Sequence, residues 1–258
     1  MSEILIDFSI SEGTGVVTLQ NQPVNAFNRE LVDNLHRIIA EIEREQTLRC
    51  VILTGVGKYF SAGADLKERR TMNDGEVQAF INKIRTGFQR WYNLEIPTIC
   101  AMNGGAYGGG LELALMCDFR IIADDAELGL KETRWGIIPG AGGTQRLSRL
   151  IGESNALKWI LPGTTYTAEE ALDDGVVTWS VPREDVATKA QEIAQEIQLA
   201  APIAVKQAKK AIREGLELDY AAALEFETTC YNVTIPTRDR MEALNAFAEK
   251  RAPEWQGR

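Results

Sequence analysis

The chain has 258 residues, 45% of them apolar, which is enough to bury a substantial hydrophobic core. Its 28 basic and 37 acidic residues give a net charge of −9, which argues against a nucleic-acid partner or an anionic membrane surface. The acidic N-terminal residues do not resemble a signal or transit peptide, and no apolar run approaches the roughly 18 residues of a membrane span. We therefore expect a cytoplasmic protein with no membrane partner.

Hydrophobic periodicity predicts a mixture of strands and helices up to about residue 181. The predicted strands, which are short apolar or alternating runs, lie at 4–10, 16–19, 50–54, 119–123, 127–130 and 176–181. The predicted helices, which have apolar residues at helical spacing, lie at 31–43, 77–91, 144–150, 156–161 and 168–172. Asn73 and Asp74 are capping candidates for the second of these helices.

From residue 186 onward the sequence predicts helices alone, at 186–199, 203–214, 220–231 and 237–250. Pro202 and Pro236 mark helix starts, and Gly215 marks a stop. Alternating strands and helices followed by helices predict an α/β fold with helices packed against sheets. Periodicity alone does not identify the topology.

The segment 96–120 stands at the centre of this pattern. A buried strand at 98–101 leads into a loop, Gly104 to Gly110, in which five of seven residues are glycine. A helix at 111–117 follows, apolar except for Glu112. Such a density of glycine indicates positive φ angles or a close approach of another group to the backbone. Burial would raise the pKa of the Glu112 carboxyl, so this segment has the features of an active site.

A second small-residue segment, Ser61 to Ala64, also follows a buried strand. Amide groups from two such turns can converge on one point and form an oxyanion hole, which stabilises negative charge on a carbonyl oxygen. The alternative interpretation is that the glycines only permit tight turns.

Two carboxylates are candidates for acid–base chemistry. Glu112 has apolar neighbours, although a buried salt bridge would also explain it. Glu132 precedes a second glycine-rich loop at 136–143, although its neighbours Lys131 and Arg134 are equally consistent with a solvated charged patch. A pair of carboxylates could hold one water molecule and divide the acid and base roles.

Several other kinds of site are excluded. The only histidine, His36, lies on the polar side of an amphipathic helix, which rules out Ser-His-Asp and Cys-His schemes and histidine zinc sites. The cysteines are widely spaced and form no CxxC pair, so we expect reduced thiols and no metal. The G-x-G-x-x-G and P-loop patterns are also absent.

Four motifs in register make the chain similar to the crotonase (enoyl-CoA hydratase/isomerase) superfamily over essentially its whole length. They are FSAGADLKE at 60–68, NGGAYGGGLELALMCD at 103–118, LGLKE at 128–132 and GIIPGAGGTQRL at 136–147. The resemblance implies a spiral of ββα repeats at residues 1–197 that carries a CoA-thioester site. It also implies a helical trimerisation region at 198–258 and a homo-hexamer built as a dimer of trimers.

The resemblance also implies catalytic roles. Ala64 and Gly109 match the two backbone N–H positions that bind the thioester oxygen. Glu112 and Glu132 match the two catalytic glutamates of the hydratases, with Glu112 as general base toward water and Glu132 as proton donor to the α-carbon. The implied substrate is a 2-enoyl-CoA, and the implied reaction is the syn addition of water. Coenzyme A is then part of the substrate, and no separate cofactor is expected.

Positions for the coenzyme A portion follow from the same resemblance. Ala62, Asp65 and Leu66 match a segment facing adenine and pantetheine. The phosphates are expected near Lys58, Lys67 and, from a neighbouring subunit, Lys250. The other implied substrate contacts are Ala26, Gly108, Pro139, Gly140 and the aromatic Phe247. The segment 21–27 is about two residues shorter than in the family and lacks its basic residue, which leaves part of the phosphate contact open.

Four functions stay open at this point. The first is an enoyl-CoA hydratase of fatty-acid or branched-chain acyl degradation. The second is a 3-methylglutaconyl-CoA hydratase of leucine degradation, which the runs 65–69 and 230–240 resemble most. A cation for its distal carboxylate could come from Arg69, Arg70, Lys83 or Arg134. The third, an isomerase, is disfavoured because such enzymes usually keep a single acid–base residue.

The fourth function is a non-enzymatic RNA-binding or scaffold protein. Some methylglutaconyl-CoA hydratases bind RNA through a lysine-rich helix. The matching helix here, 29–46, contains no lysine, so we expect no RNA binding.

Overall fold

The computed structural model describes residues 5–258, so the first residue of the predicted strand 4–10 lies outside the described part. Within this range ten strands form two sheets. The first sheet has the order β1 (Ile6–Ser11), β2 (Thr14–Leu19), β3 (Cys50–Gly55), β5 (Thr98–Met102), β7 (Phe119–Ala123) and β10 (Trp179–Val181). The second has the order β4 (Tyr59–Ser61), β6 (Gly105–Tyr107), β8 (Glu127–Gly129) and β9 (Tyr166–Thr167).

The chain alternates between these two sheets as it advances. Strands β3, β5 and β7 are parallel neighbours in the first sheet, and each is followed at once by β4, β6 or β8 in the second. Helices then return the chain to the first sheet. This repeated ββα turn confirms the predicted spiral, and it places the ends of β4, β6 and β8 beside one another.

The predicted helices are present with small shifts at their ends. The helices are α1 (Arg29–Arg44), α2 (Leu66–Arg69), α3 (Asp74–Tyr92), α4 (Gly109–Ala114), α5 (Gly143–Ile151), α6 (Glu153–Ile160), α7 (Ala168–Asp173), α8 (Val186–Gln198), α9 (Pro202–Gly215), α10 (Tyr220–Thr234) and α11 (Arg238–Glu249). Two 3-10 turns complete the set, η1 (Glu132–Trp135) and η2 (Arg183–Asp185). Asn73 caps α3 in a capping box with Glu76, as its position predicted.

The short elements β4, α2 and β9 were not predicted, and two further segments differ from prediction. The glycine-rich loop contains strand β6 and the first turn of α4, so this helix begins two residues earlier than predicted and ends at Ala114. The predicted strand at 176–181 is shortened to β10, because the amides of Val176 and Val177 both donate to the Ala171 carbonyl at the end of α7. Those amides are therefore not available to a sheet.

The first sheet is buried beneath helices. Helix α8 packs against β3, β5 and β7, and α1 packs against β1 and α3. Trp91 and Phe88 from α3 are fully buried, as are all six residues that α1 turns inward. Among the described residues, no helix is both long and apolar enough to cross a membrane. The cytoplasmic location expected from the sequence stays a prediction.

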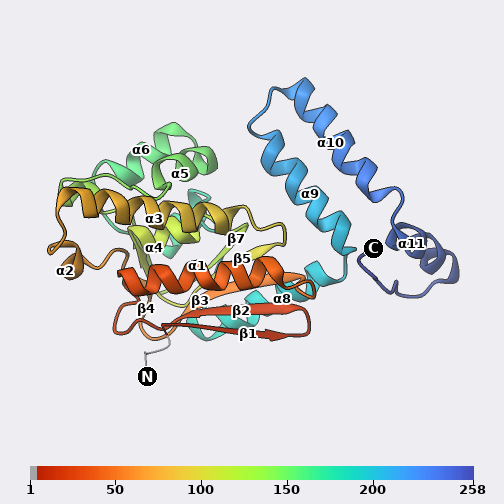
Figure 1. Ribbon diagram of the computed structural model, residues 1–258, viewed down its shortest axis with the longest axis horizontal. Coiled ribbons are helices and arrows are strands. Elements are labelled where there is room, and N and C mark those ends of the chain that lie inside the picture. The colour runs from red at the N-terminus through yellow and green to blue at the C-terminus, as the bar shows by residue number, and fades with distance from the viewer. Residues whose placement is uncertain (1–4) are drawn as a thin grey trace.

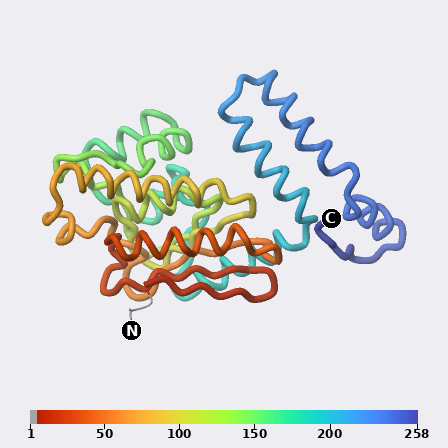
Figure 2. Tube along the Cα trace, in the orientation of Figure 1, coloured from red at the N-terminus to blue at the C-terminus, as the bar shows by residue number. Residues whose placement is uncertain are grey.

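The last three helices lie apart from the sheets. Figure 1 shows α9 and α10 as an antiparallel pair that lies beside the spiral, with α11 following the lower end of α10, and the trace in Figure 2 follows the same path. The C-terminal segment returns to the base of α9, where the Trp255 indole donates to the Leu199 carbonyl over 2.9 Å. The predicted boundary at 197/198 falls at the end of α8, and the division into two domains stays a prediction.

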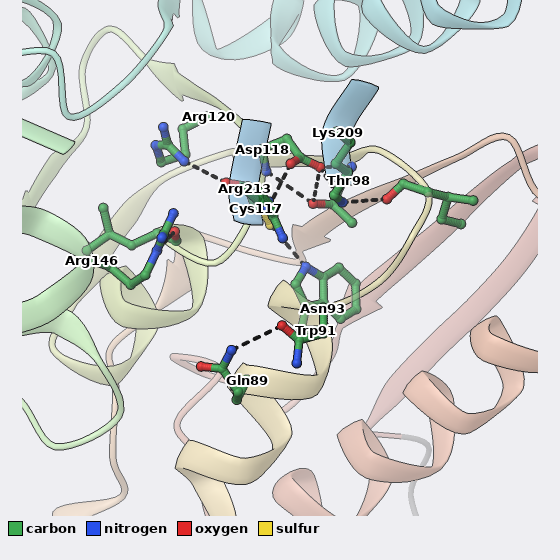
Figure 3. A network of polar contacts seen from close by, with 12 residues as sticks. Gln89, Trp91, Asn93, Thr98, Cys117, Asp118, Arg120, Arg146, Lys209 and Arg213 are labelled. Atoms are coloured by element: carbon green, nitrogen blue, oxygen red, sulfur yellow. Dashed lines mark hydrogen bonds and ion pairs between the residues drawn. The ribbon is translucent and has the colours of Figure 1, made fainter. Parts of the chain in front are cut away.

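A buried ion network joins α9 to the spiral (Figure 3). The Asp118 carboxylate, which follows α4, accepts from Lys209 Nζ and Arg213 Nη2, each over 2.7 Å. It also accepts from the Thr98 amide over 2.7 Å at the start of β5. Asp118 is therefore the shared anion between two cations of α9 and a strand of the first sheet.

We expect Asp118→Asn to destabilise the protein by about 3 kcal/mol, because it leaves two largely buried cations without a counter-charge. The measurement is denaturant unfolding at one fixed protein concentration. The control is Glu41→Gln, which breaks the exposed Arg37–Glu41 pair and should cost less than about 1 kcal/mol. Equal effects of the two substitutions would contradict the role given to Asp118.

Candidate active site

The ends of β4, β6 and β8 open onto a cavity of about 290 Å³. Ala64, Gly109, Glu112 and Glu132 all line it, although they come from three different turns of the spiral. The structure thus brings the four predicted catalytic positions to one place.

Glycine permits the close contact between the first two of these turns. Gly63 has φ +86°, and a methyl group on it would lie 2.6 Å from the Tyr107 carbonyl oxygen and 3.0 Å from the Gly109 amide nitrogen. No side chain fits between backbones that approach so closely. The segment before α2 and the segment before α4 therefore meet through main-chain atoms.

This contact places two unused amides side by side. A side chain on Gly109 would lie 3.8 Å from the Ala64 amide nitrogen. Within residues 5–258 neither Ala64 N nor Gly109 N donates to a protein acceptor, whereas Ala62, Asp65 and Gly108 donate to backbone carbonyls. Gly109 is the first residue of α4, where an amide has no partner inside the helix. Two such donors can bind one oxygen that carries developing negative charge.

Glu112 is held by the loop 141–143. Its side chain is buried, and Oε1 accepts from the amides of Ala141 and Gly143, each over 2.8 Å. Burial raises the pKa of the Glu112 carboxyl, and the backbone donors of the loop 141–143 oppose that rise because they stabilise the anion. Both hydrogen bonds go to Oε1, which leaves Oε2 for a ligand.

Glu132 faces the same cavity without such support. Its Oε2 is buried and has no hydrogen-bond partner among the described residues. Burial, and next the charge of Glu112, raise the pKa of Glu132 to about 7. Gly108 leaves room for this carboxylate, since a methyl group there would lie 3.0 Å from Glu132 Oε1.

The two carboxylates are therefore unequal. Glu112 Oε1 accepts two amide hydrogen bonds, whereas the buried Oε2 of Glu132 accepts none from the described residues, so Glu112 is better stabilised as an anion. Two carboxyl groups with different proton affinities face the same cavity, and this arrangement suits a general base and a general acid acting on one substrate.

The sequence analysis missed most of the cavity wall. It is largely apolar, and Phe27, Ile81, Ile84, Trp135, Ile137 and Ile138 contribute to it. Trp135 and Ile138 are 65% and 68% exposed, which is high for such large apolar residues. A signal was available, because three large apolar residues flank Gly136 at the start of the glycine-rich loop 136–143. An analysis of hydrophobic periodicity does not detect these residues, since the segment is too short to form a helix or a strand.

Only some of the residues predicted to contact coenzyme A line the cavity. Ala62, Leu66, Gly108 and Gly140 line the cavity. Asp65 does not line it and instead caps α2 by accepting from the amides of Lys67 and Glu68. Four other predicted positions also do not line it, namely Ala26, Lys58, Lys67 and Pro139.

Phe247 and Lys250 lie elsewhere. Phe247 is 86% exposed on α11, and Lys250 is the residue that ends this helix. Figure 1 shows α11 at the opposite end of the molecule from α2. These residues therefore do not reach the cavity of their own chain.

Comparisons with known proteins agree with this geometry. The family model described as enoyl-CoA hydratase/isomerase matches residues 9–258. The chain belongs to the enoyl-CoA hydratase/isomerase family. Its predicted place in the crotonase superfamily is thereby confirmed.

Relatives in this family are similar over nearly the whole chain. YngF of Bacillus subtilis, named as an enoyl-CoA hydratase/isomerase, is 48% identical over 249 residues, or 96% of each chain. Human mitochondrial methylglutaconyl-CoA hydratase is 41% identical over 254 residues, covering 95% of this chain and 75% of that protein. The crystal structure of enoyl-CoA hydratase from Bacillus anthracis has 44% identity and a TM-score of 0.97, and covers 99% of this chain and 100% of that one.

We expect Gly63→Ala to destabilise the protein by about 2 kcal/mol more than Gly175→Ala, because the new methyl group overpacks the contact between the two loops. The control, Gly175→Ala, measures the cost of placing a side chain on a residue with positive φ when there is no close contact. Gly175 also has positive φ, +77°, but a methyl group there would meet only Ile151 at an ordinary 4.0 Å. Denaturant unfolding of both variants measures the difference, and equal losses would show that the close contact is not the constraint.

Proposed function

We propose that the protein is an enoyl-CoA hydratase that adds water reversibly and syn to a 2-enoyl-CoA thioester. The observation that carries this proposal is the pairing of one amide-held carboxylate and one unpartnered carboxylate beside two free amides. The assigned roles match those that the resemblance implies, and the relatives named as hydratases support the reaction class.

In the proposed reaction the amides of Ala64 and Gly109 bind the thioester carbonyl oxygen. Water attacks the β-carbon and gives a proton to Glu112, while the electron pair of the double bond moves toward the carbonyl. The resulting enolate is stabilised by the two amides, because they are fixed donors that need no reorganisation. Glu132 then donates its proton to the α-carbon. One proton passes from Glu112 to Glu132 to restore the starting state.

The unequal carboxylates weigh against the other functions. An isomerase moves one proton between two carbons, for which a single acid–base residue is enough, whereas here two carboxylates face the same cavity. A scaffold protein would have no need of a buried, unpartnered carboxylate that destabilises the fold. We place the reaction in fatty-acid or branched-chain acyl degradation.

We further propose that the chain forms a homo-hexamer of two trimers through α9, α10 and α11. Leu216, Tyr220 and Phe247 are among many large apolar residues exposed on this region. Exposed apolar surface of this extent is typical of protein interfaces. In such an assembly Phe247 and Lys250 would reach the cavity of a neighbouring subunit, and Lys58 and Lys67 would face the phosphates of coenzyme A.

Glu112→Gln and Glu132→Gln should each lower the rate of crotonyl-CoA hydration by at least about 100-fold, since each removes one proton-transfer group but keeps its shape. The decrease of the thioester-enone absorbance measures the rate. Glu127→Gln is the control, because Glu127 is an exposed glutamate of β8 close in sequence to Glu132. Either variant retaining a near-native rate, with the fold intact, would refute the role of that residue.

Sedimentation velocity should find an assembly of six 28.6 kDa chains. Leu216→Asp should shift the protein to smaller species, because it places a charge on an apolar face that is 79% exposed at this residue. Ile10→Asp, an exposed apolar position on β1, should leave the assembly unchanged. A monomeric wild-type protein would contradict the proposed assembly.

A further inference from the structure

A second cavity lies between the spiral and the C-terminal helices. It has a volume of about 470 Å³, against about 290 Å³ for the cavity of the candidate active site. The end of α3 forms one wall and α9 the other, and the two elements face each other in Figure 1. The wall of this α3–α9 cavity is mostly polar, and its basic residues are Lys206, Lys209, Lys210 and Arg213. The proposed hydration reaction makes no use of it.

The two innermost cations of the α3–α9 cavity share one carboxylate. The side chains of Lys209 and Arg213 are only 10% and 14% exposed, and both reach Asp118 from α9 (Figure 3). Arg213 donates to it through Nη2, while its Nη1 is buried and has no hydrogen-bond partner within residues 5–258. Lys209 also donates to the Ile96 carbonyl, which leaves one of its three N–H donors. The inner wall therefore has more hydrogen-bond donors than the described residues use.

A third cation, Arg146 of α5, lies close to the same place. The Cζ atoms of Arg146 and Arg213 lie 4.1 and 3.8 Å from the centre of the Tyr92 ring, and this ring lines the cavity. The Arg146 guanidinium forms no ion pair in the described part of the chain, and its Nε donates only to the Leu115 carbonyl over 3.5 Å. Burial lowers the pKa of both Lys209 and Arg146, and the charge of Arg213 acts in the same direction on each. The three cations thus lie near enough to repel one another.

This inner cluster has more positive charge than its surroundings offset. Asp118 neutralises one of its three cations, so two positive charges remain. The C-terminus of α3 contributes only about half of a negative charge. The rim of the cavity is balanced by itself, because its three cations and three acids are Arg149, Lys206, Lys210, Glu95, Glu214 and Glu217. Partly buried cations without a counter-charge destabilise a protein, so an anion in this cavity would stabilise it.

We propose that the α3–α9 cavity is a binding site for a phosphate group, held mainly by Lys209 and Arg213. A phosphate group has several acceptor oxygens and close to two negative charges at neutral pH, which matches the uncompensated charge of the cluster. Guanidinium and ammonium groups both form charge-assisted hydrogen bonds with phosphate. The amides of Asn93 and Gln207 line the same cavity and provide further donors. This site is separate from the four catalytic positions and does not depend on the hydratase function.

The test is a calorimetric titration of the full chain with inorganic phosphate, with sodium chloride keeping the ionic strength constant. One phosphate should bind per chain with a Kd of about 1 mM or below. Arg213→Met should weaken this binding about 10-fold or more, the usual effect of losing a hydrogen bond to a charged group. Glycerol 3-phosphate is titrated in the same way. Tighter binding of it would assign the site to the phosphate of a larger molecule, and equal or weaker binding would assign it to inorganic phosphate.

A second variant, Gln207→Glu, does not rely on weakening the fold. It places a carboxylate of nearly the same shape on the cavity wall, so the chain supplies its own anion. In phosphate-free buffer it should raise the Tm by roughly 3 °C, and it should weaken phosphate binding about 10-fold or more. The matched control is Gln195→Glu, the same change at an exposed position of α8, which should alter neither the Tm nor the binding.

Two results would overturn the proposal. The first is phosphate binding that Arg213→Met and Gln207→Glu both leave intact, because the phosphate would then bind elsewhere. The second is a wild-type protein that binds no phosphate. If Gln207→Glu then also shifts the protein to smaller species in sedimentation velocity, a carboxylate of a neighbouring chain occupies the cavity instead. Neither variant lies in the cavity of Glu112 and Glu132, so both results would leave the hydratase function standing.

Discussion

The contact between two backbone turns is the constraint on which the site depends. Gly63 lies against the Tyr107 carbonyl and the Gly109 amide at a distance that excludes any side chain. Because the strands that precede these turns are parallel neighbours in one sheet, their ends meet there. The contact fixes Ala64 and Gly109 as adjacent, unused donors, and α4 then carries Glu112 into the same cavity.

The two cavity carboxylates, Glu112 and Glu132, have different surroundings. The loop after η1 gives two amides to Glu112, while the buried oxygen of Glu132, at the start of η1, receives no hydrogen bond from residues 5–258. Leaving a carboxylate unsatisfied costs stability, and the same burial keeps it protonated at a useful pH. Burial, and the different number of donors around each, thus give two chemically identical side chains different proton affinities.

The family resemblance predicted the spiral, and glycine density and apolar runs, which are local signals, predicted the pair of glycine-rich turns. It did not predict the strand β6 inside a glycine-rich loop, since that strand exists only through pairing with β4 and β8. Nor could it decide the surroundings of Glu132. Lys131 and Arg134 suggested a solvated patch, but Arg134 turns to the Pro162 carbonyl and Lys131 packs near Tyr107. Likewise, Arg69 and Arg70 are equivalent in sequence, and only the position of α2 shows that Arg69 faces the cavity.

The most direct test of the different proton affinities of Glu112 and Glu132 is an infrared pH titration of the ligand-free protein. A carboxylic-acid band should be present below pH 7 and disappear as the pH rises, with a midpoint near the Glu132 pKa of about 7. It should be absent in Glu132→Gln. In Glu112→Gln it should persist with a lower midpoint, because the neighbouring charge that raises the Glu132 pKa is gone. A midpoint near the ordinary glutamate value, or a band lost only in Glu112→Gln, would contradict the account.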